Sequence, residues 1–211
     1  MRMLAMLEAR FREMLILQQV IYDGTLRLDK VPVAERSHND EIESRRLSVK
    51  ETDLVVKCDK ALLLLREDGT AVAFPEAVEQ MREDMQQVVY RLAQFKVGKT
   101  TQIIEEDILA ALKEMIEALK KAQEEQEDKP KPGDPPPPGE PQDPPLIDLI
   151  AELRMVRALQ MRVNRRTDRY AELIQGEQAL DDDLIEALQQ LAERQARIHE
   201  VTRDLELGRN K

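Results

Sequence analysis

The stretch "VEQMREDMQQVVYRLAQF", residues 78–95, has a very regular hydrophobic pattern. Its apolar side chains are separated by three, four, three, four and three positions: Val78, Met81, Met85, Val88, Leu92 and Phe95. Residues three and four apart share one face of an α-helix, whereas residues of a strand alternate between two faces. The pattern therefore predicts a helix over about residues 75–96. One face of this helix must be covered by other helices.

The sequence on both sides has similar periodicity and favours an all-α fold. Five further helices are expected, over about residues 2–28, 39–67, 102–127, 146–175 and 180–207. In the first of them, Gln18 and Thr25 interrupt an otherwise apolar seam. Aromatic residues make up only 3% of the chain and Trp is absent, which is typical of long helices rather than of a thick globular core. We therefore expect an elongated helical bundle or coiled coil.

The segment "DKPKPGDPPPPGEPQDPP", residues 128–145, divides the helical regions. Pro removes backbone donors and restricts φ, so the segment cannot be helical and favours extended conformations. We interpret it as a semi-rigid linker; a docking site for an SH3-like domain is the alternative. The predicted organisation is a region of about four helices over residues 1–127, the Pro-rich linker over 128–145, and a helical hairpin over 146–211.

The hairpin is expected to be antiparallel because only a short break near Gly176 separates its two helices. Reversal at this break brings Gln160 opposite Gln195, and both amides interrupt apolar seams. Two facing amides can satisfy each other, whereas a buried amide without a partner is costly. The hairpin would then be a docking module that the Pro-rich linker holds at a distance.

A second short stretch, "AQFKVGKTT" at residues 93–101, raises the hypothesis of a nucleotide hydrolase. Ala93 through Thr100 fit a loose form of the phosphate-binding loop, in which a strand delivers a Gly-rich turn to a helix N-terminus. Here the preceding residues have a helical period. We therefore expect a connector in which Gly98 ends one helix and Thr100 or Thr101 caps the next.

Other reactive residues do not form a recognisable catalytic or metal-binding pattern. His38 and His199 lie far apart in the sequence, and Cys58 falls among core positions, where a buried, inert thiol is expected. The acidic run "IIEEDI", residues 103–108, predicts a solvated helix face. Asp181 to Asp183 are expected to supply the N-cap and the first turn of the last helix. We therefore predict no catalytic residue, cofactor or metal, and no enzymatic activity.

Arginine is concentrated in "RMVRALQMRVNRRTDR", residues 154–169. On a helix its six arginines cover about half of the circumference, centred opposite the expected packing seam. That seam includes Leu149, Leu153, Val156 and Val163. We treat this candidate interaction face as solvated or paired with the chain's own acidic helices, as a contact for an acidic protein partner, or as a site for nucleic acid or anionic lipid. The face comprises Arg154, Arg157, Arg162, Arg165, Arg166 and Arg169.

The charge of the whole chain argues against the last of these alternatives. The formal net charge is −10 at pH 7, which opposes general affinity for nucleic acid or anionic membrane. No apolar run reaches the roughly 18 residues of a membrane-spanning helix. Charged residues from Glu8 to Glu13 interrupt any apolar signal-peptide core. As written, the chain is expected to be cytoplasmic, or envelope-associated if an upstream segment is missing.

Three segments resemble a family of uncharacterised helical, coiled-coil proteins from planctomycete-type bacteria. They are "LREDGTAVAFPEAVEQMREDM", "TQIIEEDILAALKEMIEALKKAQ" and, after the Pro-rich gap, "LIAELRMVRALQMRVNRRT". The similar region covers about residues 62–170. The resemblance implies no known activity, cofactor or catalytic residue. It implies that relatives can be longer and associated with the cell envelope.

Together these features predict a non-enzymatic scaffold, adaptor or assembly subunit. A soluble component of a bacterial envelope or transport complex is the alternative, and a nucleotide hydrolase is the competitor from another class. Protein partners, including an acidic one for the arginine face, or a homo-oligomer are expected. Self-association would involve the first four helices, because the seam from Val78 to Leu92 and the wide apolar face near Leu112 need cover.

Overall fold

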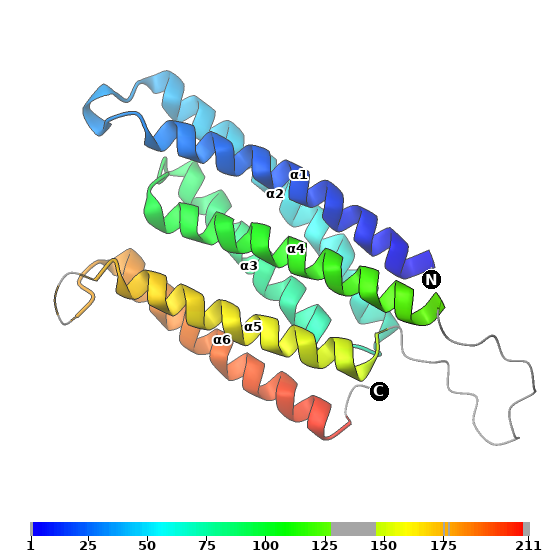
Figure 1. Cartoon of the computed structure of the whole chain (residues 1–211). Coiled ribbons are helices and arrows are strands. Elements are labelled where there is room, and N and C mark those ends of the chain that lie inside the picture. Colours follow the sequence, from blue (N-terminus) through cyan, green and yellow to red (C-terminus); the bar gives the residue numbers. More distant parts are fainter. Residues whose placement is uncertain (1, 128–146, 175, 177, 209–211) are drawn as a thin grey trace, which may run out of the picture.

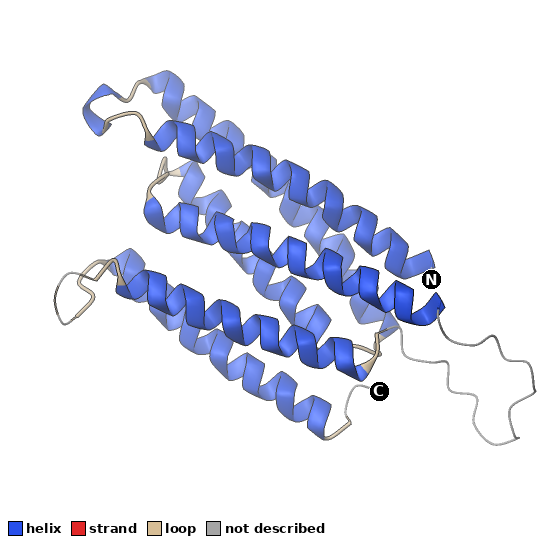
Figure 2. Cartoon of the chain, viewed as in Figure 1, coloured by secondary structure: helices blue, strands red, loops and turns tan. Residues whose placement is uncertain are grey.

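A computed structural model describes residues 2–127, 147–174, 176 and 178–208. These residues form six α-helices, one short 3₁₀ helix (Val33–Glu35) and their connections, and none of them forms a strand (Figure 2). The predicted all-α class is confirmed. The Pro-rich segment 128–145 lies outside the described residues.

Each predicted helix is present, with ends within about one turn of the expected positions. The helices are α1 (Arg2–Asp29), α2 (His38–Asp68), α3 (Ala73–Ala93), α4 (Lys99–Glu127), α5 (Leu149–Ala171) and α6 (Asp182–Glu206). Side-chain caps begin three of them. Ser37 and Asp40 form a capping box on α2, Asp148 accepts from the Ala151 amide on α5, and Asp181 accepts from the Leu184 amide on α6. The predicted N-cap at the start of the last helix is therefore confirmed.

The six helices lie in three layers of two (Figure 1). α1 and α2 form one outer layer, α3 and α4 the middle layer, and α5 and α6 the other outer layer. α3 contacts α2 and α4 and also both C-terminal helices, while α5 contacts α4 as well. Buried hydrophobic residues from all six helices form one continuous core. The C-terminal helices are therefore packed on the middle layer and not held at a distance from it.

The apolar side chains of the most regular sequence pattern are buried in the middle layer. Val78, Met81, Met85, Val88 and Leu92 of α3 are fully buried, and so are Ile108, Leu112, Met115 and Leu119 of α4. Both outer layers of the same chain cover these side chains. A second molecule is not needed to shield them, so this reason for self-association no longer holds.

Candidate functional site: an ionic cluster beneath α5 and α6 and the groove beside it

The predicted arginine face does not point wholly away from the packing seam. Arg162 and Arg166 are only 2% and 3% exposed, whereas Leu149 and Leu153, which were expected in the seam, are 53% and 49% exposed. α5 is thus rotated relative to the prediction. Its buried side carries Ala151, Glu152, Met155, Leu159, Arg162, Val163, Arg166 and Tyr170. The reason is electrostatic, because the neighbouring helices place carboxylates beneath these arginines.

The centre of this arrangement is Asp84 of α3. Arg166 donates to both of its carboxylate oxygens, from Nη1 at 2.8 Å and from Nη2 at 2.9 Å. Arg194 of α6 donates to the same oxygens at 2.5 and 3.0 Å. Asp107 of α4 accepts a further bond from Arg166 Nε. We call Asp84, Asp107, Arg166 and Arg194 the Asp84 cluster; all four are buried, and their formal charges sum to zero.

The protonation of the cluster is set by competition between burial and charge. Burial alone would raise the pKa of Asp84, but the guanidinium groups of Arg166 and Arg194 outweigh it and hold that pKa well below its usual range. Asp84 therefore stays ionised at neutral pH with both oxygens occupied by donors. Such a carboxylate is unsuited to act as a base or to bind a ligand. The cluster instead clamps α5 and α6 to the middle layer.

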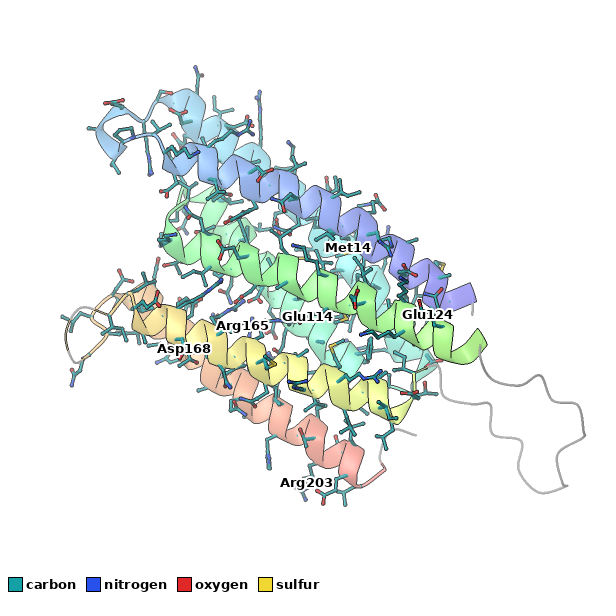
Figure 3. All side chains as sticks on the ribbon, in the orientation of Figure 1. Met14, Glu114, Glu124, Arg165, Asp168 and Arg203 are labelled. Atoms are coloured by element: carbon teal, nitrogen blue, oxygen red, sulfur yellow. The ribbon has the colours of Figure 1, made fainter. Side chains whose placement is uncertain are left out.

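The remaining arginines of the predicted face lie outside the Asp84 cluster, and all of them except Arg162 are nearer the surface. Arg162 and Arg165 both contact Glu114 of α4, at 2.6 and 3.3 Å, and Figure 3 labels Glu114 and Arg165 on these neighbouring helices. Arg169 lies 3.0 Å from Glu106 of α4. At least four of the six arginines thus face the chain's own acidic residues. Arg154 and Arg157 lie on the exposed side of α5.

The acidic run at residues 103–108 is not the solvated face that the sequence predicts. Asp107 is buried in the Asp84 cluster, and Glu105 is fully buried on the other side of α4. Glu105 accepts a hydrogen bond of 2.7 Å from Thr25 of α1. Gln18 of α1 in turn donates to buried Glu51 of α2 at 3.0 Å. The two polar interruptions of the first helix therefore pair with buried carboxylates.

These two glutamates favour their neutral forms. Burial raises the pKa of Glu105 to about 8, and burial together with the nearby Glu105 raises that of Glu51. One oxygen of each carboxylate, Glu51 Oε1 and Glu105 Oε2, has no hydrogen-bond partner among the described residues. Deprotonation at either site would leave a poorly compensated charge inside the protein.

A third buried glutamate, Glu152, lies at the start of a helix. Glu152 of α5 accepts hydrogen bonds from the backbone amides of Val72 and Ala73, both at 2.7 Å, and from that of Phe74 at 3.4 Å. The N-cap residue of α3, Val72, provides no side-chain cap of its own. Glu152 therefore satisfies free amides at the positive end of the helix dipole and joins the start of α5 to α3.

Replacing Glu152 by Ala is expected to lower the free energy of unfolding by about 1–3 kcal/mol, because the backbone amides of Val72, Ala73 and Phe74 lose their side-chain acceptor. Urea denaturation followed by circular dichroism measures the loss. Glu117→Ala, at an exposed position of α4, is the control and should change stability by less than about 0.5 kcal/mol. Equal stability of the Glu152 variant and the parent protein would show that the cap contributes nothing.

The connector at residues 93–101 differs in detail from the prediction. α3 ends at Ala93, and the left-handed residue that follows is Phe95, with φ of 57°, and not Gly98. The Lys96 amide donates a hydrogen bond of 2.9 Å to the Arg91 carbonyl. The Arg36 guanidinium lies over the Phe95 ring, with 5.0 Å between Arg36 Cζ and the ring centroid. These contacts hold Phe95 in a conformation that is otherwise costly for a bulky side chain.

The start of α4 also differs from the prediction. α4 begins at Lys99, so Thr100 and Thr101 lie inside its first turn and do not cap it from outside. Thr101 Oγ1 accepts from Arg91 and donates to the Lys96 carbonyl instead. Residues 78–93 are helical, so this stretch lacks the strand that precedes a phosphate-binding loop.

The remaining candidate residues are dispersed. Cys58 is fully buried, and burial raises the pKa of its thiol to about 12, so the thiolate is disfavoured, in agreement with the expected inert thiol. His38 lies on α2 and His199 on α6. Within the described part of the chain, no group of three or more His, Cys, Asp or Glu side chains is placed to hold a metal ion.

The expected amide pair between α5 and α6 is present. Gln160 and Gln195 each donate to the other's carbonyl oxygen at 2.7 Å. The pair lies at the solvent-facing edge of the two helices, however, and not in a buried layer. Its contribution to stability is accordingly smaller than that of a buried polar pair.

An open groove runs between α3 and α6, beside the Asp84 cluster. Its volume is about 480 Å³. It is lined by Glu83, Gln86, Gln87, Tyr90, Arg91, Thr100, Ile104, Asp183, Glu186, Ala187, Gln190, Glu193 and Arg197. A smaller hollow of about 330 Å³ lies between α4 and α5, with alanines and Met155 among its lining residues.

Comparison with known proteins finds no relative. No protein family, curated protein or solved structure matches the chain. None of the helices in the described ranges is both long and apolar enough to cross a membrane.

Sequence reasoning missed three features of this region: Asp84, Glu152 and the α3–α6 groove. Asp84 is separated from Arg166 by 82 positions and from Arg194 by 110, so no local pattern connects them. For the buried glutamates Glu51 and Glu105, by contrast, the sequence did contain a signal. Gln18 and Thr25 occupy seam positions in the first helix, where a polar side chain requires a buried partner.

Proposed function

We propose that the protein is a non-enzymatic assembly subunit that self-associates through the outer face of the α1–α2 layer. The supporting observation is a line of exposed aliphatic side chains on α2, formed by Val49, Val56 and Leu63. They are 64%, 47% and 58% exposed. Their spacing of seven residues places them on one side of the helix, away from the buried side. We call these three residues the α2 line.

The neighbouring helix adds exposed apolar residues to the same layer. α1 exposes Met6, Ile16, Leu17 and Val20, all on one side of the helix. Lys57 of α2 binds Glu13 of α1 at 2.7 Å, which joins the outer sides of the two helices. Isolated exposed aliphatic residues are ordinary, but lines at helical spacing on adjacent helices favour an interface. Fully burying one such side chain stabilises by about 1.5–3 kcal/mol.

A second copy of the chain is the occupant that fits this face best. A row of residues on one helix can meet the same row of another copy across a two-fold axis. The net charge of −10 opposes such pairing, so screening by salt should strengthen it. A role as a component of a bacterial envelope or transport complex, the alternative raised by the sequence, is compatible with this proposal.

Sedimentation velocity over a wide range of concentrations tests the proposal. The triple variant Val49→Lys, Val56→Lys and Leu63→Lys should remain monomeric where the parent protein dimerises, although its net charge is less negative. The control variant places the same charges at exposed positions of α6: Gln189→Lys, Ala192→Lys and Ala196→Lys. It should dimerise like the parent. A parent protein that is monomeric at every concentration and salt level would refute self-association.

A further inference from the structure

The α3–α6 groove has a defined register. Three contacts cross it: Glu83 with Arg197, Gln87 with Gln190, and Arg91 with Asp183. Residue numbers fall along α6 as they rise along α3, so the two helices are antiparallel. In this register Gln86 lies near Glu193 and Tyr90 near Glu186. All four side chains line the groove.

The floor and wall of the groove offer apolar contact. Ile104 of α4 and Ala187 of α6 are buried residues among its lining. Tyr90 stands at the edge with 63% of its surface exposed. An exposed aromatic ring beside an apolar floor can receive the hydrocarbon part of a long side chain, and its face attracts a cation.

The charges left available in the groove are negative. The two arginines of the lining are already paired: Arg91 with Asp183 at 3.1 Å, and Arg197 with both oxygens of Glu83 at 2.6 and 2.7 Å. By contrast, Glu186 and Glu193 are exposed, and neither forms an ion pair with any described residue. They are two helical turns apart, a separation of about 10 Å.

From this complementarity we infer that the α3–α6 groove binds a cationic segment of another protein. The segment carries two Lys or Arg side chains about 10 Å apart, which corresponds to positions i and i+7 of a helix. One cation meets Glu193, and the other lies between Glu186 and the Tyr90 ring. An apolar residue between them rests on Ile104. This reverses the charge of the partner expected from the sequence, because at least four of the six α5 arginines face acidic residues of their own chain.

This site is independent of the proposed self-association. It lies between α3 and α6, whereas the α2 line lies on the opposite outer layer. The salt dependences also have opposite signs: peptide binding in the groove weakens as salt rises, and self-association strengthens. If the test of self-association fails, the inference about the groove is unaffected, and the reverse also holds.

Titration calorimetry with a synthetic helical peptide tests the inference. The peptide is rich in Ala, with Arg at two positions seven apart and Leu between them; a second peptide has Glu in place of both Arg. The Arg peptide should bind the full chain at low salt. Glu186→Gln combined with Glu193→Gln should weaken binding by about tenfold, since each exposed ion pair contributes modestly. Tyr90→Ala should also weaken it.

A charge-matched variant separates the groove from the general acidity of the chain. Glu200→Gln combined with Glu206→Gln removes two exposed carboxylates of α6 that do not line the groove. It should bind the Arg peptide as the parent does. The inference is overturned if both double variants weaken binding equally, if the Glu peptide binds as well as the Arg peptide, or if the Arg peptide does not bind.

Discussion

Replacing Asp84 by Asn is expected to lower the free energy of unfolding by about 3–5 kcal/mol. The loss arises because Arg166 and Arg194 remain buried after their shared carboxylate is removed. Among the residues that the structure describes, Asp107 would then be the only close buried anion for these two cations. Urea denaturation followed by circular dichroism measures the effect.

The adjacent acid on the same helix provides the control. Glu83 pairs with Arg197 at 2.6 Å, and both side chains are about one-third exposed. Its contact with buried Arg194 is longer, at 3.7 Å. Glu83→Gln should therefore cost at most about 1 kcal/mol. Adding Arg194→Met to the Asp84 variant should recover part of the lost stability, because it removes one uncompensated buried charge. Equal losses for the Asp84 and Glu83 variants would mean that the cluster is not a buried clamp.

The helices were predictable because each one buries an apolar face that recurs at helical spacing. The residues from Val78 to Leu92 show this most clearly, since the burial of α3 follows the sequence pattern position by position. The caps at Asp148 and Asp181 depend on neighbours only three residues away. Both kinds of signal are local, so a single sequence contains them.

The orientation of α5 was not predictable from its own residues. Apolar periodicity favoured Leu149 and Leu153 as core positions, and arginines are usually exposed. Arg162 and Arg166 could turn inward only because Glu114, Asp84 and Asp107 are supplied by helices 48 to 82 positions away. The contact of Glu152 with the start of α3 was not predictable for the same reason, because 78 to 80 positions separate the partners in the sequence. Long-range electrostatic pairing thus decided which face was buried.

Removal of the carboxylate at Glu105 should have the opposite effect to that at Asp84. Glu105→Gln is expected to stabilise the protein by about 3 kcal/mol at pH 7, and by more at higher pH. The parent residue has a pKa of about 8 in the folded state against an ordinary value of 4.5, so folding at pH 7 requires it to bind a proton. Gln keeps a neutral polar group of the same shape beside Thr25.

The sign of the pH dependence follows from this raised pKa. Below pH 4.5 Glu105 is protonated in both the folded and the unfolded states, and its contribution to stability is fully present. As the pH rises, the unfolded chain ionises first, and stability falls by about 1.4 kcal/mol per pH unit until the folded-state pKa is passed. Stability of the parent protein should therefore decline between about pH 5 and pH 8, and this decline should be shallower in Glu105→Gln.

Urea denaturation at a series of pH values distinguishes this effect from a general loss of charge. Glu117→Gln removes an exposed carboxylate from the same helix and should leave the pH profile of the parent unchanged. Glu51→Gln should flatten the profile as well, because burial and the charge of Glu105 also raise the pKa of Glu51. The two substitutions should not be additive, since Glu105→Gln also removes the charge that helps to raise the pKa of Glu51. Parallel curves of stability against pH for the parent and Glu105→Gln would mean that Glu105 is ionised in the folded protein. The negative charge of Glu105 between α1 and α4 would then have to be compensated by another group.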